Sequence, residues 1–94
     1  MSARDAANYY NQTVTVEGKV ASTYKSDRVI WLIMGTNQKT DFKVVIFPED
    51  WPKFSQVPDV LFRSKTLRAT GKVQAYLNAP EMIVKDPRAI IVVQ

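Results

Sequence analysis

The sequence contains two similar stretches, "VTVEGKVAST" at residues 14–23 and "LRATGKVQAY" at residues 67–76, and each includes the triplet Gly-Lys-Val. Apolar and polar residues alternate in both, which is the period of a β-strand with one face in solvent. Glycine weakens the interior of a strand, yet two of the three glycines of the chain stand there. We interpret Gly18 and Gly71 as points where long strands bend in a small barrel and where a crossing backbone approaches closely.

Three further strands are predicted from runs of apolar, β-branched and aromatic residues. They cover residues 28–35, residues 41–47, and a last part at 81–85 and 89–93, which is a strand pair or one strand interrupted at "DPR". Residues 49–62 are the one segment where a short helix fits. Five strands of this size bury an interior when the sheet closes into a barrel, because closure removes the sheet edges.

The segment "PEDWPKF" at residues 48–54 interrupts the sheet with two prolines. Glu49 and Asp50 follow the first of these prolines, and carboxylates favour the first turn of a helix. We expect a cluster of large side chains here to close one end of the barrel: Trp51, Phe54, Leu61 and Phe62.

Length and composition are those of one folded domain, which we assign to residues 1–94, with residues 1–10 as a lead-in segment. The 46% content of hydrophobic residues excludes a disordered tail. No apolar run approaches the roughly 20 residues that cross a bilayer, and "MSARDAANYY" has no signal-peptide core, so no membrane partner is expected. The absence of cysteine is compatible with any compartment, and the cytoplasm is slightly favoured.

The residue types that the chain lacks argue against catalysis. There is no histidine and no cysteine, and the nine carboxylates form no spaced cluster. No glycine-rich phosphate loop is present. We therefore predict no enzyme activity, no catalytic residue, no metal site and no cofactor. The net charge of +4 slightly favours a polyanionic partner.

Motifs along nearly the whole chain resemble one family. "QTVTVEGKVASTY", "DFKVVIFPEDWPKF" and above all the ending "PEMIVKDPRAI" are similar to the small bacterial OB-fold nucleic-acid-binding domains. The resemblance implies an all-β fold, a five-stranded Greek-key OB-fold barrel with a short helix between strands three and four. It implies binding of DNA or RNA less strongly, since OB folds also bind oligosaccharides and proteins.

Single strands are bound by aromatic faces that stack on bases and by cations that contact phosphates. In OB folds this site lies across strands two and three and the loops beside them. The nucleic-acid-binding residues predicted on that surface are Tyr24, Lys25, Arg28, Trp31, Lys39, Lys43, Tyr76 and Asn78.

The alternation of the second and third strands gives a direction to two of these side chains. If Ile30, Leu32 and Met34 fill the barrel, Trp31 points outward onto the binding face. If Lys43 points to solvent, Phe42 belongs to the core, because lysine is seldom buried unpaired. The same alternation in the strand at residues 41–47 makes Val45 and Phe47 point outward, where the helical segment could cover them.

The sequence thus predicts a non-enzymatic domain that binds single-stranded DNA or RNA by stacking and phosphate contacts, with little sequence specificity. The alternative is a protein-interaction or self-association module on the same fold, in which outward apolar residues bind a partner chain or a second copy. The residues leave open a homodimer, a larger host protein, and the choice between DNA and RNA.

Overall fold

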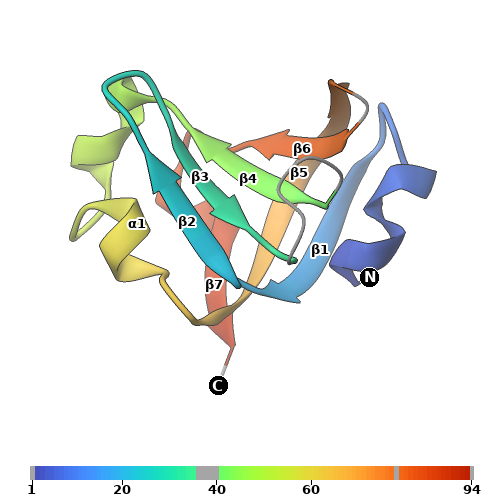
Figure 1. Cartoon of the computed structure of the whole chain (residues 1–94), viewed down its shortest axis with the longest axis horizontal. Coiled ribbons are helices and arrows are strands. Elements are labelled where there is room, and N and C mark those ends of the chain that lie inside the picture. The colour runs from blue at the N-terminus through green and yellow to red at the C-terminus, as the bar shows by residue number, and fades with distance from the viewer. Residues whose placement is uncertain (1, 36–40, 78, 94) are drawn as a thin grey trace.

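The structure, a computed structural model, describes residues 2–35, 41–77 and 79–93 (Figure 1). The chain is all-β with a few short helices, of which those marked η are 3-10 helices. In chain order the elements are η1 (Ala3–Asn8), β1 (Thr13–Lys19), β2 (Ser22–Lys25), β3 (Ile30–Ile33), β4 (Lys43–Ile46), η2 (Pro48–Lys53), α1 (Pro58–Leu61), β5 (Thr66–Tyr76), β6 (Ala79–Ile83), η3 (Pro87–Ala89) and β7 (Ile90–Val93).

The strands form one curved sheet with the order β1-β5-β6-β4-β3-β2, and β7 pairs with β5 beside this path. All pairings are antiparallel except that of β4 with β6. The first and last strands of the order, β1 and β2, are consecutive in the chain and are separated only by Val20 and Ala21. The Val20 N–H donates to the Lys65 carbonyl at 2.9 Å, and the Ala21 N–H donates to the Ile33 carbonyl at 2.8 Å. The chain therefore passes from one end of the sheet order to the other within a single bend.

The described residues form seven strands where the sequence predicts five, because two expected strands are divided. The strand expected at residues 13–24 becomes β1 and β2 on either side of the bend, and the last part becomes β6 and β7, separated by η3. The helical segment expected at residues 49–62 contains η2 and α1, and Glu49 and Asp50 lie in the first turn of η2 as predicted.

The mid-strand glycines make room for side chains. A Cβ atom on Gly18 would lie 3.0 Å from both the Ala3 Cβ and the Met34 Sδ, and one on Gly71 would lie 3.0 Å from the Met82 Cγ. Neither glycine has a positive φ. The expectation that a crossing backbone fills these positions was therefore wrong, since the close neighbours are side-chain atoms, two of them from buried methionines.

The core follows the predicted alternation of the strands. The inward residues of β3, β4 and their ends, which are all buried in one hydrophobic cluster, are Ile30, Leu32, Met34, Phe42, Val44 and Ile46. Phe54 and Phe62 pack edge to face at 5.9 Å within the same cluster, and Trp51 and Leu61 pack against it. The Trp51 indole N–H donates to the Ile46 carbonyl at 2.9 Å, which fixes η2 against the end of β4.

Candidate nucleic-acid interface

One face of the sheet points away from the core. We call it the outer face, and it is formed by the outward side chains of β2, β3, β4, β6 and the end of β5. Strand register arranges them in two rows. The aromatic row consists of Tyr24, Trp31, Val45 and Ile83, which are successive register partners from β2 to β6. The polar row consists of Lys43, Glu81 and Gln74, which are partners across β4, β6 and β5.

Trp31 lies on this outer face, as its position in the strand predicts. Its side chain is partly exposed and stays outside the hydrophobic core cluster. The rings of Trp31 and Tyr24 are tilted by 41° with centroids 5.0 Å apart, and Tyr24 is 46% exposed. Two aromatic rings are therefore held side by side next to solvent, which is the arrangement on which a nucleic-acid base can stack.

Lys43 faces outward, yet only 3% of it is exposed. Its Nζ lies 4.7 Å from the centroid of the Trp31 ring and 5.4 Å from that of Tyr76, so two cation–π contacts hold the ammonium group. The expectation that Lys43 points to solvent was wrong, although the residue lies on the predicted side of the strand, because the rings of Trp31 on β3 and Tyr76 on β5 lie close to its ammonium group. Its contact with phosphate stays a prediction.

Glu81 is the acidic neighbour of Lys43 in the polar row and is 7% exposed. Burial raises the pKa of its carboxyl group above the usual 4.5, and the nearby Lys43 ammonium group opposes this rise. The outer face therefore contains a buried acid and a buried base on adjacent strands.

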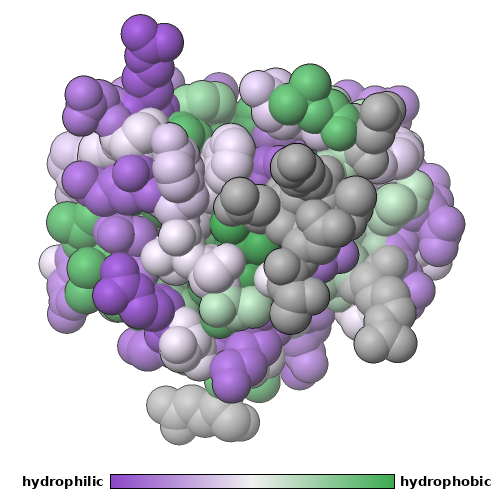
Figure 2. All heavy atoms as spheres, viewed as in Figure 1, coloured by the Kyte–Doolittle hydropathy of each residue, from purple (hydrophilic) through white to green (hydrophobic). Residues whose placement is uncertain are grey.

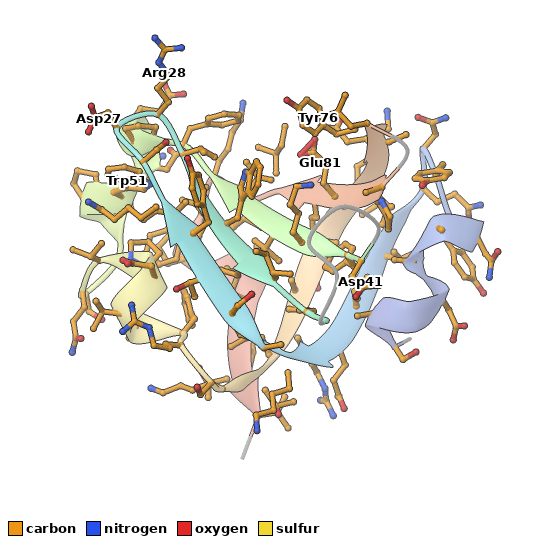
Figure 3. All side chains as sticks on the ribbon, viewed as in Figure 1. Asp27, Arg28, Asp41, Trp51, Tyr76 and Glu81 are labelled. Atoms are coloured by element: carbon orange, nitrogen blue, oxygen red, sulfur yellow. The ribbon has the colours of Figure 1, made fainter. Side chains whose placement is uncertain are left out.

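A groove of about 440 Å³ runs over this face. The residues that line it are Arg28, Val29, Trp31, Val45, Phe47, Gln74, Tyr76, Glu81 and Ile83. Figure 3 shows Tyr76 and Glu81 close to each other on β5 and β6, and Figure 2 shows hydrophilic and hydrophobic side chains intermingled on the visible side of the molecule. The groove combines ring faces and aliphatic walls with polar groups, which is the usual composition of a ligand site.

Two cations stand where β2 turns into β3. Arg28 is exposed and extends away from the body of the molecule (Figure 3), while its backbone N–H donates to the Ser26 Oγ at 3.2 Å. Lys25 ends β2, and its Nζ lies 5.3 Å from the centroid of the Trp51 ring. Arg28 lines the groove, whereas Lys25 is the register partner of the core residue Ile30 and lies on the other side of β2 from Tyr24.

Of the eight predicted site residues, five belong to this surface: Tyr24, Arg28, Trp31, Lys43 and Tyr76. Lys25 lies beside the Trp51 ring, on the other side of β2. Lys39 and Asn78 lie outside the described residues. Sequence reasoning missed Glu81 and Gln74, although the alternation of Glu81 with Met82 and Ile83 already places this acid on the outer side of a strand. Val45 and Phe47 do lie outward, but they line the groove together with Trp31 and Tyr76.

Within residues 2–35, 41–77 and 79–93, no group of three or more potential metal ligands is close enough to hold an ion. No helix in the same ranges is long and apolar enough to span a membrane. Several other cations of the described chain are paired away from the groove, such as Arg68 with Glu17 at 2.7 Å and Arg88 with Asp86 at 2.8 Å.

No protein-family model and no curated protein match the chain. Among solved structures, asparaginyl-tRNA synthetase from Entamoeba histolytica is similar with 23% identity and a TM-score of 0.65, over 99% of this chain and 23% of that one. The asparaginyl-tRNA synthetase from Pyrococcus horikoshii has 14% identity and a TM-score of 0.65, over 100% and 23% of the two chains. The hypothetical protein ygiW from E. coli has 20% identity and a TM-score of 0.57, over 99% and 88%. The matched regions are OB-fold domains, so the chain has an OB-like fold and spans only a small part of the synthetases.

Proposed function

We propose that this chain is a five-stranded Greek-key OB-fold barrel that binds single-stranded DNA or RNA and has no catalytic activity. In this assignment β1 and β2 count as one bent strand, and the domain belongs with the small bacterial OB-fold nucleic-acid-binding domains that its motifs resemble. The single observation that supports binding most strongly is the groove on the outer face, where the rings of Trp31 and Tyr76 lie with the exposed cation Arg28 and where Tyr24 packs beside Trp31.

Stacking supplies most of the affinity in this proposal. A base on an aromatic side chain contributes about 1–3 kcal/mol, and the contact tolerates every base because each has a π-face. Trp31 is the central ring, since Tyr24 and the Lys43 ammonium group both lie within about 5 Å of its centroid and hold it in place. Most of the affinity is then independent of sequence.

Phosphate contacts come from two exposed cations, Arg28, which lines the groove, and Lys25, which ends the neighbouring strand β2. Each such contact releases counterions, so the binding constant falls as salt rises. Because Lys43 is held between two rings, we expect few contacts and modest affinity for the isolated chain. The synthetase likeness covers only part of longer chains, so this unit is also proposed as a domain of a larger protein.

The test is a titration of labelled single-stranded DNA, single-stranded RNA and duplex with the wild-type chain and Trp31→Ala. Stacking predicts that the variant binds single strands about 1–3 kcal/mol more weakly while its circular dichroism spectrum stays unchanged. The matched control is Trp51→Phe, which removes the other indole and leaves Trp31 as the sole reporter, whose fluorescence should be quenched by the oligonucleotide. Equal affinity of a folded Trp31→Ala variant would contradict the stacking role.

The second candidate function is self-association or binding of a partner protein, and the edge strand β7 favours it. Ile91 is 61% exposed, and within the described residues β7 pairs with β5 alone. The outward apolar residues Ile33 and Val45 are almost fully buried and offer little surface to a partner. Molar mass measured by light scattering distinguishes the functions, because a stable dimer indifferent to oligonucleotide favours association through this edge.

A further inference from the structure

We propose that Glu81 and Lys43 recognise the edge of one base in the groove, and that the preferred base is guanine. This inference rests on the proposed function, and it names the chemistry of one subsite within a site that otherwise binds any sequence.

The two side chains form a donor–acceptor pair at the groove, where Glu81 is a lining residue and Lys43 lies directly beside it on β4. Lys43 and Glu81 are direct register partners in the parallel pairing of β4 with β6, where neighbouring strands lie about 4.8 Å apart. They are 3% and 7% exposed, so their own strands fix their positions. Tyr76 stands next to Glu81 (Figure 3), and its ring lies 5.4 Å from the Lys43 Nζ. A base that enters the groove along Trp31 and Tyr76 would thus meet a carboxylate acceptor on Glu81, with the ammonium donor of Lys43 beside it.

The Glu81 carboxylate has unused capacity to accept hydrogen bonds. Within residues 2–35, 41–77 and 79–93 it forms neither a hydrogen bond nor an ion pair within 4.0 Å, and Lys43 acts on it only through charge. Burial disfavours the charged form of this carboxyl group, and a ligand with N–H donors would stabilise it. Gln74, its partner on the other side in β5, adds an amide to the same row.

Guanine fits this arrangement better than the other bases. Its Watson–Crick edge presents the O6 acceptor beside two donors, N1–H and N2–H, so the ammonium group of Lys43 matches O6 and the two oxygens of Glu81 match the donors. Thymine and uracil offer one N–H between two carbonyl oxygens, and one of those oxygens would face the carboxylate. Adenine and cytosine each present a single amino group, which leaves one carboxylate oxygen without a partner.

The carboxylate must be ionised to accept both hydrogen bonds. Burial raises the pKa of Glu81, whereas the Lys43 ammonium group favours the ionised form; Arg28, the other cation that lines the groove, is exposed. The N–H donors of guanine favour the same form, so binding guanine should release a proton wherever Glu81 is partly protonated.

The experiment compares a short oligothymidylate of about ten nucleotides with versions that carry one central guanine, cytosine, adenine, inosine or 7-deazaguanine. We expect the guanine version to bind about five- to tenfold more tightly than oligothymidylate, at the lower end of the range for bidentate base contacts. Inosine lacks the N2 amino group and should lose most of this gain, while 7-deazaguanine keeps the Watson–Crick edge and should retain it. The measurement uses the wild-type protein, so it does not depend on the folding of a variant.

Glu81→Gln should bring the ratio of guanine to thymine affinity close to one, because an amide offers one acceptor in place of two. Glu49→Gln removes the same charge from an exposed position on η2 and should leave the ratio unchanged. Equal affinity for all versions, or a preference for cytosine, would overturn the guanine assignment and leave the stacking function intact. Failure of every single strand to bind would instead overturn both proposals.

Discussion

Replacing Lys43 with methionine removes the ammonium group from the outer face and keeps a chain of similar length. The Nζ lies 4.7 Å from the Trp31 centroid and 5.4 Å from that of Tyr76, and the residue is 3% exposed. A cation–π contact contributes about 0.5–1 kcal/mol when exposed and about 2 kcal/mol when desolvated. The variant loses two cation–π contacts but also avoids the cost of desolvating an ammonium group. The expected net loss is about 2 kcal/mol in the free energy of unfolding at pH 7. For a domain of this size, that lowers Tm by roughly 8–16 °C.

The loss should depend on pH through Glu81. Folding raises the pKa of the Glu81 carboxyl group above 4.5, its value in the unfolded chain. The folded protein therefore loses stability as the pH increases from 4.5 through the pKa of the folded state. Without Lys43 the pKa of Glu81 rises further, so ionising this group costs more in the variant than in the wild type. The difference in stability between wild type and Lys43→Met should therefore be larger at pH 7 than at pH 4, where Glu81 is largely protonated in both states.

Urea denaturation at both pH values provides the assay, with the slope m showing whether unfolding stays two-state. The double variant Lys43→Met/Glu81→Gln completes a double-mutant cycle. An electrostatic interaction between the two side chains predicts a coupling energy of about 0.5–3 kcal/mol. A Lys43→Met protein as stable as the wild type at pH 7, with additive effects in the double variant, would refute the reasoning. The Lys43 side chain would then stabilise the fold only through the packing of its methylene groups.

Two further predictions concern the sheet and the rim of the groove. Gly71→Ala places a Cβ atom 3.0 Å from the Met82 Cγ. This crowding should lower the free energy of unfolding by about 1–3 kcal/mol in the same urea assay. An unchanged midpoint would show that Met82 moves aside at no cost. Replacing Lys25 and Arg28 with glutamine should reduce the slope of log affinity against log salt for single strands by about 0.7 per residue, whereas Lys65→Gln, next to the bend between β1 and β2, should leave the slope unchanged. An equal effect of all three substitutions would show that net charge alone determines the salt dependence.

The side of each strand was predictable from the sequence because alternation in a strand is local. Once Ile30, Leu32 and Phe42 are assigned to the core, the outward positions of Trp31 and Lys43 follow, and the structure has both on the outer face. The cluster around Phe54 and Phe62 was predictable for a similar reason, since large rings beside prolines between two strands have few other places to pack.

What neighbouring strands do to a side chain was not predictable in this way. Lys43 is buried because Trp31 comes from β3 and Tyr76 from β5, and nothing near Lys43 in the sequence specifies these neighbours. Glu81 becomes part of the site through the parallel pairing of β4 with β6, a contact between distant segments. The close approach of Met82 to Gly71 depends likewise on the register of β5 with β6.

The unequal pairing of the strands bears on how the binding face moves. β5 has three hydrogen-bonded neighbours, β1, β6 and β7, whereas β2 has β3 as its one strand partner among the described residues. Amide protons of β5 should therefore exchange with deuterium only on global unfolding, while those of β2 should exchange through a cheaper local opening. Since β2 carries Tyr24, whose ring packs against Trp31, this opening would let the ring beside the groove adjust to an incoming strand while the rest of the sheet keeps its shape.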